Sequence, residues 1–233
     1  MAIRLVVFDV AGTTVRSGGG AVQRAMRAAI AAAGLELRDG AMDGVTGMAK
    51  PQAIRTLLEG HGREELIPRT DAIHADFVAR MRRYYRDDPA VAAVDGALET
   101  FAVLHAAGIR IALDTGFSRA ILDEVLTRLG WIGATSPIDA TVTSDEVARG
   151  RPHSDMIDAL RARLGGVPSA EVAKVGDTPI DLYEGTMARC GLVVGVLSGS
   201  HGLDSLMQHP NDALIQSIAQ LPALLRDRGL MSG

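Results

Sequence analysis

The sequence predicts an α/β fold, a doubly wound parallel sheet that carries an inserted all-helical segment. From about residue 94 onward, short apolar segments of strand length alternate with segments of helical periodicity, and this alternation is typical of a parallel sheet. An earlier apolar run begins at Ile3 and stops abruptly at Asp9, before a Gly-Thr-Thr turn, as a buried strand does at the carboxyl edge of such a sheet. Between these two parts, residues 21–86 contain helical patterns and no strand pattern.

The inserted segment is expected to contain three helices. The first begins at Ala21 and is closed by Gly34, and the other two cover residues 52–58 and 71–85, with apolar residues at helical spacing. A run of one serine and three glycines at 17–20 precedes them and is interpreted as a hinge. The predicted organisation is an α/β core domain of residues 1–15 and 94–233 and a helical cap domain of residues 16–93.

The core is expected to alternate strands and helices along the chain. Apolar runs predict strands at 109–113, 140–143, 172–175 and 192–197, with a short edge strand at 213–215. Helical spacing predicts helices at 97–107, 118–129, 154–164 and 182–190. Because the carboxyl ends of parallel strands open onto one edge of the sheet, polar residues at those ends are expected to converge there.

Composition limits the class of protein. A chain of 233 residues fits one large domain or a core with an insert. The 24 basic and 28 acidic residues give a net charge of −4, which is too balanced for a nucleic-acid surface. A single cysteine, Cys190, excludes an intramolecular disulfide framework and a Cys-rich zinc site. The sequence shows no signal-peptide pattern and no apolar run of membrane-spanning length, so we expect a soluble, cytoplasmic protein without membrane or nucleic-acid partners.

Polar residues follow three of the predicted strands, at positions 9–14, 114–116 and 176–181. Asp177 and Asp181 stand four residues apart where a strand passes into a helix, so both can face one point. Together with Asp9 they form a cluster of hard oxygen ligands suited to Mg²⁺. Asp177 and Asp181 alone could instead cap the helix, but the convergence of a third acid from another strand favours a metal site.

Two further positions are suited to binding phosphate oxygens. Thr115 and Gly116 offer a hydroxyl and a close backbone N–H at a strand-to-helix turn. For Thr115 alone, a helix cap is the ordinary interpretation. Arg151 precedes Pro152, which fixes the backbone beside it. Beside such a cluster, we expect the Arg151 guanidinium to neutralise a phosphoryl group.

In this order, the clusters resemble the four motifs of the haloacid dehalogenase-like hydrolase superfamily. The motifs are Asp9 to Thr13, Thr115-Gly116, Arg151-Pro152, and Gly176-Asp177-Thr178 with Asp181. The resemblance covers the whole chain, including a helical cap inserted after the first motif. It implies that Asp9 attacks phosphorus and forms an aspartyl-phosphate.

The same resemblance implies roles for the other motif residues. Mg²⁺ would be held by Asp9, by the backbone carbonyl of Ala11 and by Asp177, with Asp181 supporting them. The implied phosphate-binding positions are Ala11, Gly12, Thr115, Gly116 and Arg151.

Ala11 is the informative departure from the commonest motif. Typical phosphatases of this superfamily carry a second aspartate there, which is the general acid for the leaving alcohol and the base for water, and alanine can do neither. The Asp-x-Ala-Gly-Thr form, with Arg rather than Lys before the proline, resembles the phosphonatase (phosphonoacetaldehyde hydrolase-like) branch. There the leaving group is carbon, and a cap lysine forms an imine with the substrate aldehyde.

Lys50 is the candidate for that lysine and for a contact to the substrate. Gly47 and Lys50 match the Met-Gly-x-x-Lys pattern of the phosphonatase branch, whereas Thr46 stands in place of the methionine and Ala53 in place of a histidine that assists the lysine. Amine catalysis needs a carbonyl substrate and a lowered lysine pKa. Lys50 is therefore expected either to form the imine, or to be a charged substrate contact or a solvated residue at the start of a helix.

The favoured hypothesis is a Mg²⁺-dependent hydrolase that cleaves the P–C bond of phosphonoacetaldehyde or a similar small phosphonate, with Asp9, Lys50 and Arg151 as catalytic residues. The second hypothesis is a phosphatase of the phosphoglycolate type, acting on small phosphate esters whose leaving groups need no protonation. The third is a non-catalytic protein that binds a phosphorylated metabolite, although the intact Asp9 and Asp177 argue against it. Cap-mediated dimers occur in the phosphonatase branch, so the resemblance alone suggests a homodimer.

Overall fold

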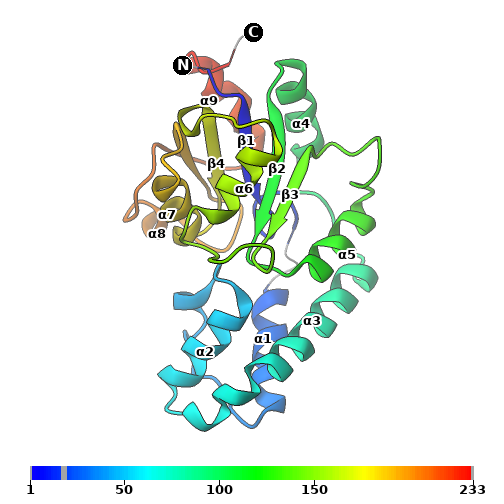
Figure 1. Cartoon of the computed structure of the whole chain (residues 1–233), viewed down its shortest axis with the longest axis vertical. Helices are drawn as coiled ribbons and strands as arrows, with labels where there is room; N and C mark the ends of the chain where they lie inside the picture. Colours follow the sequence, from blue (N-terminus) through cyan, green and yellow to red (C-terminus); the bar gives the residue numbers. More distant parts are fainter. Residues whose placement is uncertain (1, 17–19, 232–233) are drawn as a thin grey trace.

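Six parallel strands form the centre of the molecule in the computed structural model, which describes residues 2–16 and 20–231 (Figure 1). The strands are β1 (Leu5–Asp9), β2 (Arg110–Thr115), β3 (Ala140–Thr143), β4 (Val172–Gly176), β5 (Leu192–Val196) and β6 (Ala213–Ile215). Their order in the sheet is β3-β2-β1-β4-β5-β6. The predicted doubly wound α/β fold is therefore confirmed, including its short edge strand.

β1 can lie in the middle of the sheet because all five of its residues are buried. Successive side chains of a strand point to opposite faces, so Leu5 enters one hydrophobic cluster and Phe8 another. Parallel pairing of β1 with β2 sets Asp9 opposite Asp114. Two acids therefore reach the carboxyl edge of the sheet side by side.

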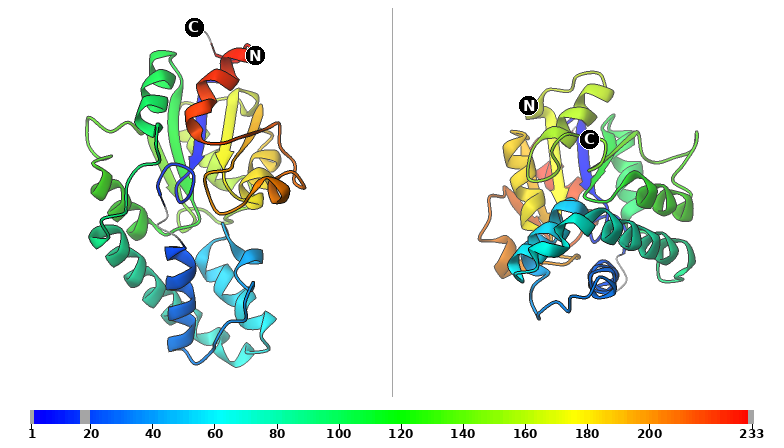
Figure 2. Two further views of the ribbon diagram at one scale, coloured as in Figure 1. Left: turned by 180° about the vertical axis from the view of Figure 1, so that it is seen from behind. Right: turned by 60° about the horizontal axis from the view of Figure 1, so that its bottom comes forward.

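Helices cover both faces of the sheet (Figures 1 and 2). They are α4 (Ala97–Ala106), α5 (Arg119–Leu129), α6 (Asp155–Arg163), α7 (Pro179–Met187), α8 (Leu203–Leu206) and α9 (Leu221–Asp227). Phe8 packs on one face in a cluster with Phe101 of α4 and Leu122 of α5. Leu5 packs on the other face with Ile157 of α6. Cover on both faces is what a parallel sheet requires.

Two features of the core differ from the sequence-based expectation. α7 begins at Pro179, earlier than the predicted start at 182, because Thr178 and Asp181 form a capping box around it. The sequence pattern does not predict α8 and α9. α9 is fixed in place by buried Leu221 and Leu225, which join the same cluster as Phe8.

Three helices extend from the carboxyl edge of the sheet, and we call residues 20–87 the helical insert (Figure 1). The helices are α1 (Ala21–Ala32), α2 (Lys50–Gly60) and α3 (Thr70–Asp87), joined by single 3₁₀ segments at Asp43–Val45 and Glu64–Arg69. All three helices contribute buried side chains to one hydrophobic cluster, for example Met26 of α1, Ile54 of α2 and Phe77 of α3. Within residues 2–16 and 20–231, none of the helices has both the length and the apolar character needed to cross a lipid bilayer.

The chain enters and leaves the insert along neighbouring segments. Val15 bridges to Ala93, and the Val94 N–H donates to the Thr14 carbonyl at 3.0 Å. Residues 17–19 of the predicted hinge lie outside the described residues. The two chain segments that connect the insert to the core are therefore held together by backbone hydrogen bonds.

Candidate active site

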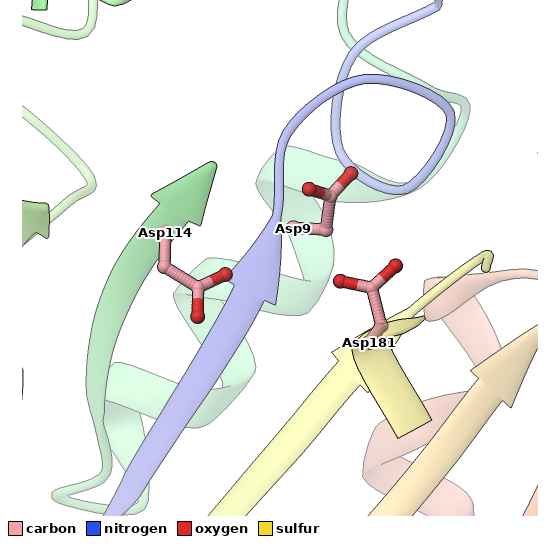
Figure 3. Close-up of side chains that lie close together, drawn as sticks. All are labelled: Asp9, Asp114 and Asp181. Atoms are coloured by element: carbon pink, nitrogen blue, oxygen red, sulfur yellow. The ribbon is translucent and has the colours of Figure 1, made fainter. Parts of the chain in front are cut away.

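Asp9, Asp114 and Asp181 meet at the carboxyl edge of the sheet (Figure 3). Asp9 ends β1, Asp114 lies in β2, and Asp181 lies in the first turn of α7. One carboxylate oxygen of each lies within 4.8 Å of the others, a spacing at which they could hold a metal ion. Acids that are far apart in the sequence thus converge at this edge.

All charged side chains that are buried in the described part of the chain belong to this region. The five acids are Asp9, Asp114, Asp177, Asp181 and Glu184, and the three bases are Lys50, Arg151 and Lys174. Burying a charge is costly unless the charge is paired and hydrogen-bonded. The pairing of these groups therefore decides which of them are held rigidly and which are free to react.

Arg151 joins four of the five acids. Its Nη1 donates to Asp9 at 2.7 Å and lies 2.8 Å from Asp181, and its Nε donates to Glu184 at 2.8 Å. Its Nη2 donates to the Asp114 carboxylate and, at 2.9 Å, to the Asp114 carbonyl oxygen. Because only 1% of the side chain is exposed, these contacts give Arg151 a positioning role toward Asp9. Its binding of a phosphoryl group stays a prediction.

Lys174 is the second cation of this network, and it is not among the site residues predicted from the sequence. Its Nζ contacts the Asp114 carboxylate and lies 2.9 Å from Glu184 and 3.4 Å from Asp181. Gly185 leaves room for the stem, since a Cβ there would lie 2.8 Å from the Lys174 Cβ. A lysine inside the otherwise apolar strand β4 is the signal that could have identified the network, because buried lysines are paired.

Burial disfavours the charged form of the two predicted metal-binding aspartates, Asp9 and Asp177. Burial raises the pKa of Asp9 to about 7, against the opposing effect of Arg151. Burial and the neighbouring Asp181 also raise the pKa of Asp177, although the Ser200 N–H and hydroxyl donate to Asp177 at 2.7 and 2.8 Å. Five buried acids stand against three buried bases, and a bound cation would stabilise the carboxylate forms of Asp9 and Asp177 that burial disfavours. Hard divalent cations prefer such oxygen donors, so these residues fit Mg²⁺.

A cavity of about 630 Å³ lies between the core and the helical insert. The predicted site residues in its wall are Asp9, Ala11, Gly12, Lys50, Thr115, Gly116 and Arg151. The remaining two, Asp177 and Asp181, are fully buried and interact electrostatically with Asp9. The structure thus brings the predicted residues into one region, while their individual roles stay predictions.

Two glycines bring the insert into backbone contact with the core. At Gly116, a Cβ would lie 2.7 Å from the carbonyl oxygens of Gly47 and Met48. Gly47 has a φ of +85°, and a Cβ there would lie 2.3 Å from the Ile180 side chain. Glycine is therefore required at both positions. Their contact places the start of α2 at the edge of the sheet.

Lys50 is the first residue of α2, and only 5% of it is exposed. Its Nζ donates to the Met48 carbonyl at 3.0 Å and lies 5.5 Å from the centre of the Phe117 ring. Burial lowers the pKa of Lys50 to about 8, although the Asp9 carboxylate acts in the opposite direction. This burial excludes the interpretation of Lys50 as a solvated residue at the start of a helix. A buried amine with a lowered pKa has the properties of a lysine nucleophile.

The two positions that depart from the phosphonatase pattern also line the cavity. The Thr46 hydroxyl donates to the Met42 carbonyl at 2.9 Å. Ala53 lies about one turn after Lys50 on α2. Both side chains are smaller than those of the pattern, and Ala53 cannot transfer a proton to or from the Lys50 amine.

Residues 3–186 match the model of the haloacid dehalogenase-like hydrolase family. The chain belongs to this family. Membership makes the protein a hydrolase and agrees with the fold and with the acids at the carboxyl edge.

Relatives in the haloacid dehalogenase-like family include phosphonoacetaldehyde hydrolases. That of Bacillus cereus (strain AH187) is 31% identical over 216 residues, which cover 87% of this chain and 79% of the relative. That of Syntrophobacter fumaroxidans is 30% identical over 211 residues, covering 85% of this chain and 74% of the relative.

Two solved structures share the fold. A hydrolase from Pseudomonas syringae has a TM-score of 0.84 at 19% identity, covering 96% of this chain and 98% of its own. A phosphonoacetaldehyde hydrolase-like protein from Oleispira antarctica has a TM-score of 0.82 at 22% identity, covering 99% and 94%.

Replacement of Lys174 by methionine tests the buried network. Lys174→Met removes the charge and leaves Asp114 and Glu184 with one partner fewer, so we expect the free energy of unfolding to fall by about 3–5 kcal/mol. The double variant Lys174→Met/Glu184→Gln removes one charge of each sign and should recover about 1 kcal/mol or more of this loss. Urea unfolding followed by circular dichroism measures both changes.

Arg82→Met is the matched control, because Arg82 pairs with Glu124 at 2.8 Å where half of the Arg82 side chain is exposed. Exposed pairs contribute about 1 kcal/mol or less, so the control should lose no more than that. A loss in Lys174→Met as small as in Arg82→Met would contradict the network.

Proposed function

We propose that this hydrolase is a Mg²⁺-dependent phosphonatase. It cleaves the P–C bond of a small phosphonate whose carbonyl group neighbours the cleaved carbon, such as phosphonoacetaldehyde. The observation that carries the proposal is the cavity shared by Lys50 and Asp9, in which an amine of lowered pKa and a carboxylate face one substrate. Ala11 lacks the acid that phosphate-ester cleavage uses, and the identity of about 30% to phosphonoacetaldehyde hydrolases supports the same reaction.

The first step uses the Lys50 amine. The neutral amine adds to the substrate carbonyl and water leaves, which forms an imine on Nζ. An ordinary lysine, with a pKa of about 10.4, is almost fully protonated near neutrality. Burial lowers the pKa of Lys50 to about 8, so a much larger fraction of the amine is neutral. The Met48 carbonyl and the Phe117 ring orient it.

Asp9 then attacks phosphorus, and the P–C bond breaks. The electron pair of that bond moves onto carbon and is delocalised toward the protonated imine nitrogen, which gives an enamine, while the phosphoryl group passes to an Asp9 oxygen. Thr115 and Gly116, which line the same cavity, hold the phosphoryl oxygens.

The enamine takes a proton at carbon, and hydrolysis of the imine releases the aldehyde and Lys50. Water hydrolyses the aspartyl-phosphate. No alcohol leaves, so the P–C cleavage needs no acid at position 11, and the water that hydrolyses the aspartyl-phosphate must be activated by a group other than Ala11.

Asp9, the Ala11 carbonyl and Asp177 are the proposed Mg²⁺ ligands. Their fit rests on the excess of buried acids over buried bases and on the raised pKa values of Asp9 and Asp177, whose carboxylate forms a cation would stabilise. When bound, the ion neutralises charge on the phosphoryl group. Asp181 supports the ligands through Arg151, which lies 2.8 Å from Asp181 and donates to Asp9.

The two other hypotheses predict different reactions. A phosphatase of small phosphate esters would release phosphate from esters and leave phosphonoacetaldehyde intact. A non-catalytic binding protein would release phosphate from neither, and membership of a hydrolase family argues against it.

Borohydride trapping tests the imine. Sodium borohydride added together with phosphonoacetaldehyde should reduce the imine to a stable secondary amine, which inactivates the protein and leaves an alkyl adduct on Lys50. Because burial lowers the pKa of Lys50 to about 8, the trapping rate should rise with pH and level off near pH 8. For an ordinary lysine it would continue to rise toward pH 10. Peptide mass mapping locates the adduct.

The sequence provides the control, because Lys50 and Lys174 are the only lysines in it. Burial acts to lower the pKa of Lys174, but Asp114 and Glu184 raise it above its usual range, so Lys174 should carry no adduct. Lys50→Arg keeps the charge and should abolish both trapping and P–C cleavage. An unlabelled Lys50, with Lys50→Arg still active, would contradict the proposal.

A thermal shift with Mg²⁺ tests the metal site without an activity measurement. A ligand that binds only the folded state stabilises it, so about 10 mM MgCl₂ should raise the unfolding temperature by about 3 °C or more. Asp177→Asn should lose this shift, whereas Asp204→Asn, at an exposed aspartate of α8, should keep it. Equal shifts in the two variants would argue against Asp177 as a ligand.

A further inference from the structure

The cavity beside Lys50 is larger than phosphonoacetaldehyde requires. Its volume of about 630 Å³ corresponds to about twenty water molecules at the roughly 30 Å³ that each occupies in the liquid. Phosphonoacetaldehyde carries only an acetaldehyde group on phosphorus and would leave most of this space to solvent.

The direction of α2 sets the order of groups along the cavity. Met48 touches Gly116 at the edge of the sheet, and α2 runs from Lys50 toward the far end of the insert (Figure 1). Ala53 lies about one turn beyond Lys50. The cavity wall therefore continues from Asp9 in the core to Lys50 and then to further residues of the helical insert.

The part of the wall contributed by the insert and its connections is mainly apolar. Its apolar side chains are Val22, Met26, Met42, Val45, Ala53, Ala90 and Val94. Val22 and Val94 are half-buried and present open apolar surface, Ala90 is exposed, and the others are buried. The polar side chains on this side are Thr46 and Lys50 of the helical insert, with Arg16 and Gln23. Arg16 is exposed and paired with Asp95, which places it at the rim.

The two departures from the phosphonatase pattern, Thr46 and Ala53, also favour a larger substrate. Thr46 is smaller than the methionine of that pattern, and Ala53 is smaller than its histidine. Both line the cavity next to Lys50. They leave space in the cavity that the larger side chains of the pattern would occupy.

We propose that the substrates are 2-oxoalkylphosphonates, R–CO–CH₂–PO₃²⁻, in which R is an apolar chain of several carbons. The inference rests on the proposed function and names its substrate class. The phosphoryl group lies beside Asp9, the carbonyl carbon lies at the Lys50 amine, and R lies along Val22, Met42 and Val45. Burial of R removes apolar surface from water, which is a favourable contribution that phosphonoacetaldehyde cannot make.

A ketone reacts through the same bonds as the aldehyde. The Lys50 amine and the ketone form an imine with loss of water, and transfer of the phosphoryl group to Asp9 breaks the P–C bond and leaves an enamine. Protonation of the enamine at its terminal carbon, followed by hydrolysis, releases the methyl ketone R–CO–CH₃. Water releases phosphate from Asp9. Water is the only co-reactant.

The test compares kcat/KM for phosphate release from 2-oxopropylphosphonate and 2-oxohexylphosphonate. Both are ketones, so their carbonyl reactivity is matched and they differ only in chain length. Burial of each added methylene is expected to contribute about fourfold. We therefore expect the longer ketone to be favoured on the order of tenfold or more.

Two variants narrow the apolar part of the cavity. Val22→Phe does so from α1 and Thr46→Met does so beside Lys50, and both should move the ratio of long to short ketone toward one. Val78→Phe is the matched control, because Val78 is a half-buried valine of α3 that packs against the same hydrophobic cluster as Val22 but is not among the residues that line the cavity. This control should keep the ratio.

The outcomes separate the inference from the function on which it rests. If phosphonoacetaldehyde and the short ketone release phosphate but the long ketone is not favoured, the inference is overturned and the proposed function stands. An unchanged ratio in both Val22→Phe and Thr46→Met would also overturn it. If none of the three phosphonates releases phosphate, the proposed function fails as well.

Discussion

The buried pairing of Arg151 with carboxylates is the interaction on which the rest of the site depends. One guanidinium, with 1% of its side chain exposed, contacts acids on β1, β2 and α7. An unpaired buried charge would cost several kcal/mol, so these three segments can bring their acids to one edge only if a cation accompanies them. Arg151 and Lys174 meet this need, and Arg151 also donates to the Asp9 carboxylate. The nucleophile proposed at Asp9 is thus oriented by Arg151.

The two lysines of the chain illustrate how environment sets the chemistry of one residue type. Lys174 Nζ lies 2.9 Å from Glu184 and contacts Asp114, so that its ammonium form is stabilised and it acts as a fixed charge. Lys50 is also buried, but its Nζ donates to a backbone carbonyl and faces an aromatic ring. Desolvation with weaker compensation favours the neutral amine. The structure therefore contains one structural lysine and one lysine suited to nucleophilic chemistry.

The sequence predicts the fold and the edge of the sheet at which the acids meet, because strand ends can be read from local patterns and parallel topology sends them to one side. Asp9 and Thr115 could be located in this way. Lys174 stands out as a lysine inside an apolar strand, but its partner Asp114 lies 60 positions away, so the pairing could not be predicted. Glu184 has the pattern of an ordinary helix residue. The burial of Lys50 could not be predicted from local sequence patterns either. It depends on the backbone contact between Gly47 and Gly116, which no local pattern of residues encodes.

The products of phosphonoacetaldehyde test the central claim, that Lys50 and Asp9 act together on one P–C bond. The substrate would be incubated with the protein and Mg²⁺ in D₂O, beside a panel of small phosphate esters, and followed by ³¹P and ¹H NMR. The account predicts inorganic phosphate and acetaldehyde whose methyl group has taken up deuterium from solvent, as protonation of an enamine requires, with slower release from the esters. Phosphate released from esters while phosphonoacetaldehyde persists would contradict it.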